Sequence, residues 1–172
     1  GGQRSTGLLT WLNDCFRGST VSLSRQRQVK QLTESLSDSV DKARTDVSQL
    51  FDSLRGFIEG HASDQGEYDR NLLLTPSKRT QPGWSRVEIA WEDLNVVLSA
   101  VSDDLDHLYI ALEDLGENKV SGYDYLVLEI STLLYQNKEL CQRLDSLVSH
   151  PDTENIYWLT INVQNNSVGM YT

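Results

Sequence analysis

Proline is scarce in this sequence, with 3 residues among 172, and glycine is not enriched, with 11. Together with 38% hydrophobic and 23% charged residues, this scarcity excludes a disordered, collagen-like or linker-like chain. A chain of this length can bury a substantial core, so we expect residues 1–172 to form a single domain. It begins without Met and stops within a strand-like pattern, and we therefore expect it to be cut from a larger chain.

Cysteine is rarer still, with only two residues, Cys15 and Cys141. They lie far apart, each inside a helical apolar pattern, so we expect buried free thiols rather than a disulfide. The three histidines, His61, His107 and His150, lack the spacing of metal ligands. We therefore expect no metal site in this chain.

Long apolar runs and an excess of positive charge are both missing. No apolar run approaches the ~20 residues needed to cross a bilayer, and no signal peptide opens the chain. We expect a soluble, cytoplasmic protein with no membrane partner. With 15 Lys and Arg against 25 Asp and Glu, the net charge is −10, which repels phosphate over long distances. Nucleic-acid contact would be confined to local basic patches.

What the sequence does contain is helical periodicity. The segment 7–16, GLLTWLNDCF, gathers its apolar residues on one helical face and predicts a short docking helix. Apolar residues spaced by threes and fours over 29–58, 84–115 and 123–148 predict three long amphipathic helices. Ser19 or Thr20 offers an N-cap for the first, which places Arg25, Arg27 and Lys30 at its start. The irregular choice of apolar residues along these stripes favours packing within one domain over a coiled coil.

The period changes in two other segments. A brief apolar run at 71–75 predicts a short strand, and 77–83 reads as a polar loop. Residues 155–163, NIYWLTINV, alternate as a strand, and a turn at 164–167 precedes a returning strand at 168–171. Because an isolated hairpin is marginal, we expect it to add the earlier strand or to pack on the helices.

The predicted fold class is therefore mainly α. It has three long antiparallel helices, a short docking helix and a small β-hairpin or sheet element at the C-terminus.

Motifs that carry chemistry are absent. The sequence has no phosphate-binding glycine loop and no GxSxG, HExxH or CxxC motif. Adjacent acids such as Asp103 and Asp104 are best explained as solvated helix faces. We expect no catalytic, cofactor-binding or metal-binding residue, so the chain alone should not be an enzyme.

Two basic clusters are candidates for contact with nucleic acid. The first consists of Arg25, Arg27 and Lys30, and the second of Lys78, Arg79, Trp84 and Arg86. Cations beside an aromatic ring can meet phosphates and stack a base. The alternative is solvent exposure for the charges and core packing for Trp84. The same two alternatives apply to Trp158, and we expect it to be a buried anchor rather than a stacking platform.

The order of several segments resembles the arch region of the DinG/XPD-like helicases, especially the bacterial DinG type. These segments are GLLTWL near the start, VSQLFDSLRGFIEG, NLLLT, and NKEL followed by ENIYWL near the end. In that family a helical insertion in the first motor domain leads back into that domain through a YW strand. The stretch 154–159 is the most specific part of the resemblance.

The resemblance implies a non-catalytic arch that helps enclose or guide single-stranded DNA beside the motor domains of the same chain. The parent would be an ATP-dependent DNA helicase of DNA repair, whose motor domains use ATP and Mg. Some relatives carry a four-cysteine iron–sulfur cluster, which two separated cysteines cannot supply. The alternative function is a helical protein–protein interaction or self-association module with no nucleic-acid role.

Overall fold

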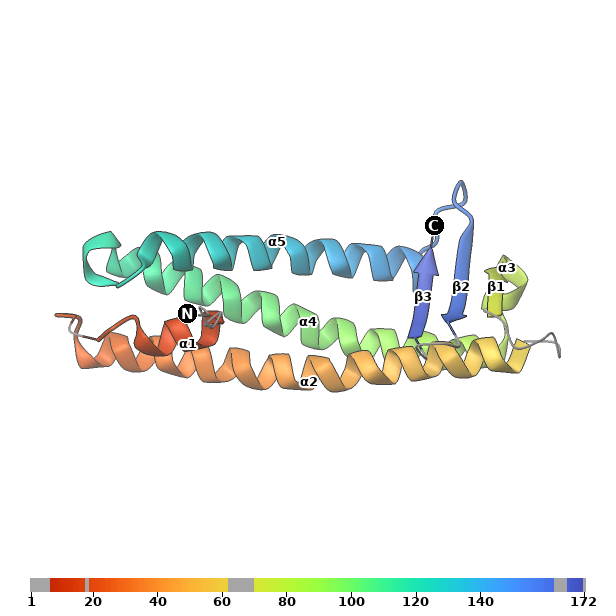
Figure 1. The fold of residues 1–172 in the computed structure, drawn as a ribbon, viewed down its shortest axis with the longest axis horizontal. Coiled ribbons are helices and arrows are strands. Elements are labelled where there is room, and N and C mark those ends of the chain that lie inside the picture. The colour runs from red at the N-terminus through yellow and green to blue at the C-terminus, as the bar shows by residue number, and fades with distance from the viewer. Residues whose placement is uncertain (1–6, 18, 62–69, 163–166, 172) are drawn as a thin grey trace, which may run out of the picture. The chain divides into compact units, whose positions relative to one another are not determined.

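The structure is a computed structural model that describes residues 7–17, 19–61, 70–162 and 167–171. Within these residues, five α-helices carry most of the chain and three strands form a small antiparallel sheet (Figure 1). The predicted fold class is therefore confirmed.

The chain is divided into two compact units. Unit 1 comprises Gly1–Lys42 and Val97–Leu140, and unit 2 comprises Ala43–Val96 and Cys141–Thr172. Three long helices contribute a segment to each unit: α2, Leu23–His61; α4, Pro82–Leu115; and α5, Tyr123–Val148. The bounds of α5 are those predicted, and α4 begins two residues earlier than predicted.

The helix α2 begins at Leu23, so Arg25, Arg27 and Lys30 lie on its first turns, as predicted. Its apolar stripe begins only at Val29, because these first turns consist mostly of polar residues that carry no apolar period. The Gln26 side chain holds this end by donating a hydrogen bond to the Val21 carbonyl at 2.8 Å. Good helix formers such as Arg and Gln extend the helix without contributing to its buried face.

The core of unit 1 includes the short helix α1, Leu8–Asp14, together with parts of α2, α4 and α5. Leu12 is buried with Leu108, Leu112 and Leu126, which are fully shielded from solvent. Both cysteines are free, as predicted; Cys15 is buried and Cys141 is half-buried. Burial raises the pKa of the Cys15 thiol to about 11, so it stays protonated and is a poor nucleophile.

The turn between α4 and α5 is fixed by close contact with the α1 segment. It contains the short 3-10 helix η1, Glu117–Lys119, flanked by two glycines with positive φ, Gly116 and Gly122. A Cβ on Gly122 would lie 2.9 Å from the Trp11 ring, and the neighbouring Ser121 amide donates to the Cys15 carbonyl at 3.0 Å. Glycine is required at Gly122 by both its backbone conformation and the space available.

Unit 2 carries the sheet. Strands β1, Arg70–Leu74, β2, Tyr157–Asn162, and β3, Ser167–Tyr171, lie in the order β1-β2-β3 with antiparallel pairing. In the register, Leu72 lies opposite Leu159. The prediction that the hairpin adds the strand near Leu72 is therefore confirmed, whereas the predicted turn at 164–167 falls mostly outside the described residues.

The predicted polar loop over 77–83 is wrong. Residues Pro76–Arg79 form a short helix, α3, and α4 already begins at Pro82. Proline is favoured in the first turn of a helix, where its missing N–H has no partner to lose, so the two prolines start helices here. As a result, Lys78 and Arg79 lie on an ordered turn.

Candidate nucleic-acid interface

In unit 2, Arg79 is bound to the end of α5. Its Nη1 donates hydrogen bonds to the Leu147 carbonyl and, at 3.1 Å, to the Val148 carbonyl. Its guanidinium carbon lies 5.0 Å from the centre of the Trp84 ring and 5.2 Å from that of Tyr157. Burial lowers the pKa of Arg79. A cation is favourable beside the last carbonyls of a helix, so Arg79 caps α5.

Trp84 is part of the unit 2 core. It is fully buried, and its Nε1 donates to the same Val148 carbonyl at 3.3 Å. Its ring packs edge-on against Phe57, with the ring centres 5.1 Å apart. The core-packing alternative for Trp84 is therefore confirmed, and in this conformation its faces are covered by protein.

The other two members of the second cluster differ in exposure. Lys78 is half-buried and its Nζ donates to the Leu73 carbonyl at 2.8 Å. Arg86 is exposed and lines a cleft that also contains the Asp52 carboxylate. This cluster thus presents one exposed cation, beside a carboxylate that opposes phosphate binding.

The prediction that Trp158 is a buried anchor is wrong, because 43% of its surface is exposed. Strand alternation buries Tyr157, Leu159 and Ile161 on one face of β2 and leaves Trp158 on the other. On this outer face the Thr160 hydroxyl donates to the Asn71 side chain at 2.7 Å. Trp158 therefore lies on the accessible face of the sheet.

In unit 1, the first basic cluster remains accessible. Arg25, Arg27 and Lys30 are all exposed on the first turns of α2. An Arg25 nitrogen lies 3.8 Å from Asp114 and the Lys30 nitrogen 3.7 Å from Glu34, with all four side chains about half exposed or more. Exposed pairs of this kind contribute only ~0–1 kcal/mol. An incoming phosphate can therefore replace these partners at small cost.

Two of these cations, Arg27 and Lys30, border a cleft of about 360 Å³, which we call the basic cleft. It is lined by Leu12 and Asn13 of α1, Phe16, and Leu23, Gln26, Arg27 and Lys30 of α2. Among the described residues that line it, none carries a carboxylate, although the chain has a net charge of −10. Sequence reasoning missed Phe16, because its helical spacing assigned it to the apolar face of the docking helix.

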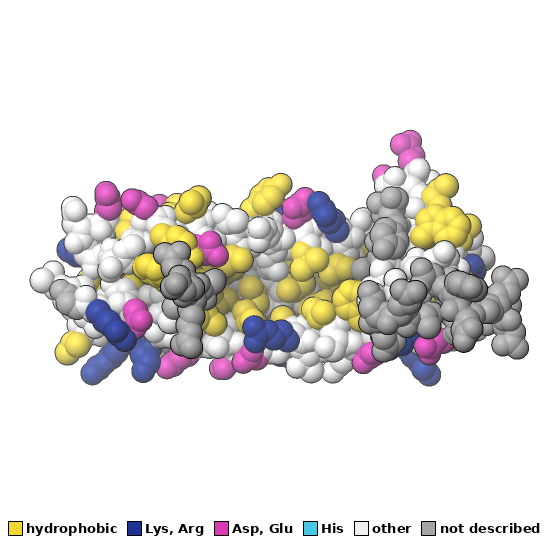
Figure 2. All heavy atoms as spheres, in the orientation of Figure 1, with side chains coloured by type: hydrophobic (Ala, Val, Ile, Leu, Met, Phe, Trp, Pro, Cys, Tyr) yellow, Lys and Arg dark blue, Asp and Glu magenta, His cyan; other side chains and the backbone are white. Residues whose placement is uncertain are grey.

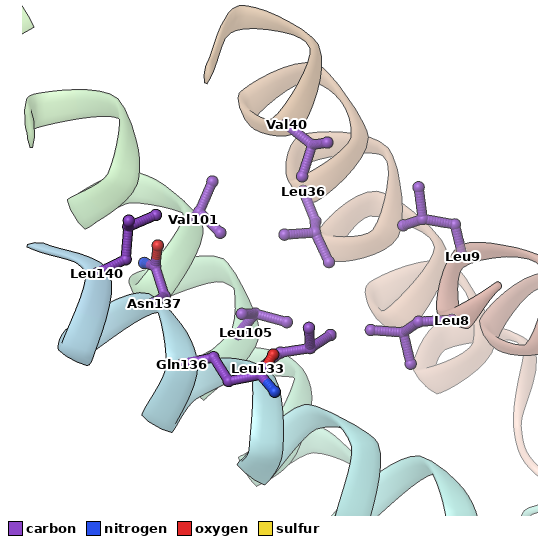
Figure 3. Close-up of a pocket in the computed structure, with 10 residues that line it drawn as sticks. All are labelled: Leu8, Leu9, Leu36, Val40, Val101, Leu105, Leu133, Gln136, Asn137 and Leu140. Carbon is purple, nitrogen blue, oxygen red and sulfur yellow. The ribbon is translucent and has the colours of Figure 1, made fainter. Parts of the chain in front are cut away.

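A second hollow in unit 1 is apolar, and we call it the apolar groove. It measures about 360 Å³ and opens beside α1, where Figure 2 shows hydrophobic side chains gathered at the surface. Figure 3 shows its lining: Leu8 and Leu9 of α1, Leu36 and Val40 of α2, Val101 and Leu105 of α4, and Leu133, Gln136, Asn137 and Leu140 of α5. Asn137 donates to the Leu98 carbonyl at 2.7 Å and to the Ser102 hydroxyl at 2.8 Å, so its amide group belongs to the packing of α4 against α5.

No metal-binding group of three or more His, Cys, Asp or Glu occurs among the residues that the structure describes. In the same part of the chain, no helix is both long and apolar enough to cross a membrane. The sequence matches no protein-family profile, and no curated protein or solved structure is significantly similar to it. The basic cleft and the apolar groove are therefore judged by their own chemistry.

Proposed function

We propose that this chain is a non-catalytic arch domain that encloses or guides single-stranded DNA beside the motor domains of an ATP-dependent helicase in the cytoplasm. The supporting observation is the pair of exposed cations Arg27 and Lys30, with Arg25 on the same turns of α2, at a cleft whose described lining residues carry no carboxylate in an acidic chain. ATP and Mg would act in the motor domains of the parent. The order of segments that resembles DinG-type arches supports the same proposal.

The physical role of the cations is to hold the strand without reading its sequence. Phosphate contacts position a nucleic acid, whereas contacts with base edges specify it. From Arg25 to Lys30 the helix axis rises roughly 7.5 Å. Neighbouring phosphates of a single strand are spaced more widely than the ~3.4 Å axial rise of a duplex strand, so this length is comparable with the step from one phosphate to the next. The cations therefore suit a guide that lets a strand of any sequence pass.

We expect the chain to bind a fluorescent oligo-dT at low salt, with an affinity that falls as salt increases. Loss of two phosphate contacts in the double variant Arg27→Ala/Lys30→Ala should reduce the slope of log affinity against log salt by roughly 1.4, at ~0.7 per contact for a single strand. Fluorescence anisotropy at several salt concentrations measures this slope.

The matched control is Lys42→Ala/Lys138→Ala, which removes two exposed cations from unit 1 without touching the basic cleft. It produces the same change in net charge. If the control reduced the slope equally, only net charge would matter and the cleft would have no special role. If the unaltered chain bound no DNA even at low salt, the guiding function would be rejected.

The alternative function is a helical module for self-association, and it has its own supporting observation. Leu128 and Tyr135 lie seven residues apart on α5, and each is 68% exposed. Residues at this spacing share one face of a helix and can form a seam with a second copy.

Light scattering over a hundredfold range of concentration separates the two functions. For the DNA guide we expect a constant mass of 19.5 kDa. A mass that rises with concentration and returns to the monomer value in Leu128→Glu/Tyr135→Glu would favour the self-association module.

A further inference from the structure

The basic cleft has a rigid apolar floor. Leu12 is almost completely buried, and Phe16 is half-buried and packed against the core cluster of unit 1. Contact with the core restrains the Phe16 ring, and Phe16 also lines the cleft. Leu23 of α2, which is 70% exposed, adds a further apolar side chain to the lining of the cleft. A restrained aromatic ring at an accessible surface is a suitable platform for a planar group.

The sides of the cleft supply amides. The Gln26 nitrogen donates to the Val21 carbonyl at 2.8 Å, which orients the amide and leaves its oxygen able to accept. Asn13 is exposed and also lines the cleft, where its amide can both donate and accept. Two amides can bond to the edges of any base, because each base presents both donors and acceptors.

The rim of the cleft supplies positive charge. Arg27 and Lys30 lie one turn apart on α2 and are both exposed. Lys30 pairs with the exposed Glu34 at 3.7 Å, and Glu34 lies outside the lining of the cleft. A phosphate at the rim would therefore meet two cations without an opposing carboxylate in the cleft itself. Phosphate is favoured here over a neutral or cationic group.

The size of the cleft limits what it can hold. Its volume of about 360 Å³ lies at the lower end of the ~300–1,000 Å³ found for small-molecule sites. One base with its sugar suits such a space better than a stacked pair. A base inside a duplex is paired and stacked, so only a single strand can offer one at small cost.

We propose that the basic cleft is a nucleotide subsite, in which one base of a single strand stacks on Phe16 while its phosphates contact Arg27 and Lys30. This proposal rests on the proposed function and adds to it a base-dependent contact. A guide that holds only phosphates would bind a strand equally well with or without its bases. The nucleotide subsite, in contrast, should bind a strand with bases more tightly than one without bases.

The test compares two oligonucleotides of equal length and charge, an oligo-dT and its abasic counterpart. Stacking of one base changes affinity by roughly 5- to 150-fold. We expect the unaltered chain to prefer oligo-dT by a factor in this range. Phe16→Leu should abolish the preference while leaving the affinity for the abasic strand unchanged. Arg27→Ala should lower the affinity for both strands.

The matched control is Phe51→Leu, the same change at a half-buried position of α2 in unit 2. This variant should keep the preference. Circular dichroism should show that both Phe variants retain the helical content of the unaltered chain. Equal binding of the two strands by the unaltered chain would overturn the subsite and leave the DNA guide intact, whereas binding of neither strand would overturn both.

A second measurement does not depend on the folding of any variant. An oligonucleotide carrying one 5-iodouracil is photo-crosslinked to the unaltered chain, and the attached peptide is identified by mass spectrometry. We expect attachment within residues 12–30, which contain the lining of the cleft. Attachment only in unit 2, for example at the exposed Trp158, would overturn the proposal.

Discussion

Replacing Trp84 by alanine is expected to lower the free energy of unfolding by about 3–5 kcal/mol, the range for a large aromatic residue in a core. Trp84 is fully buried, packs against Phe57 and donates a hydrogen bond to the Val148 carbonyl. The alanine variant removes all three interactions and leaves a cavity. Urea unfolding followed by circular dichroism measures the loss.

Trp158→Ala provides the matched control, because it removes the same side chain from an accessible face of the sheet, where it is 43% exposed. We expect a loss of less than about half that of Trp84→Ala, since less apolar surface is withdrawn from water there. Equal losses for the two variants would contradict the assignment of Trp84 to the core of unit 2.

The second large effect is expected for Arg79→Met, which keeps an unbranched stem but removes the guanidinium group. Two carbonyls at the end of α5, those of Leu147 and Val148, lose a charged donor, and the rings of Trp84 and Tyr157 lose a cation. Hydrogen bonds to charged groups contribute ~1.5–3 kcal/mol, so we expect a loss of roughly 2–4 kcal/mol.

Hydrogen exchange can locate this loss within the chain. The amides of Ser149 and His150 both donate to the Asp145 carbonyl at 2.9 Å, at the end that Arg79 caps. Relative to the unaltered chain, Arg79→Met should accelerate the exchange of these amides more than that of the amides in the middle of α5. Arg86→Met, at an exposed position, should change stability by no more than ~0.5 kcal/mol. Unchanged exchange at Ser149 and His150 would show that the guanidinium does not hold the helix end.

The helices of this fold could be predicted where burial follows a regular period. The apolar stripe of α5 recurs from Leu126 to Leu147 with one interruption at Asn137, and the bounds of the helix were predicted correctly. The start of α2 has no such stripe, and α3 consists of a single turn after Pro76, so periodicity could not find either of them. The sheet could be predicted because β2 alternates and a hairpin needs a partner strand.

The candidate site was less predictable, because its contacts join segments that are distant in the sequence. Arg79 and Trp84 were grouped correctly as neighbours, but the carbonyl that they share, that of Val148, belongs to the end of α5. Phe16 reaches the basic cleft because α1 docks beside the first turns of α2. The local sequence pattern of a short helix does not predict where that helix will dock. Trp84 is buried and Trp158 is exposed, and this difference likewise depends on which other elements pack against each ring.

The cap on α5 also has a consequence for the order of folding. Most helices are completed by residues next to their own ends, but the carbonyl of Leu147 is bonded by a side chain 68 positions earlier in the sequence. Closing a loop of that length has an entropic cost that must be met before the contact forms. The final turn of α5 should therefore become stable only after α3 and the first turn of α4 have reached it, so this helix end is expected to be a late event on the folding pathway.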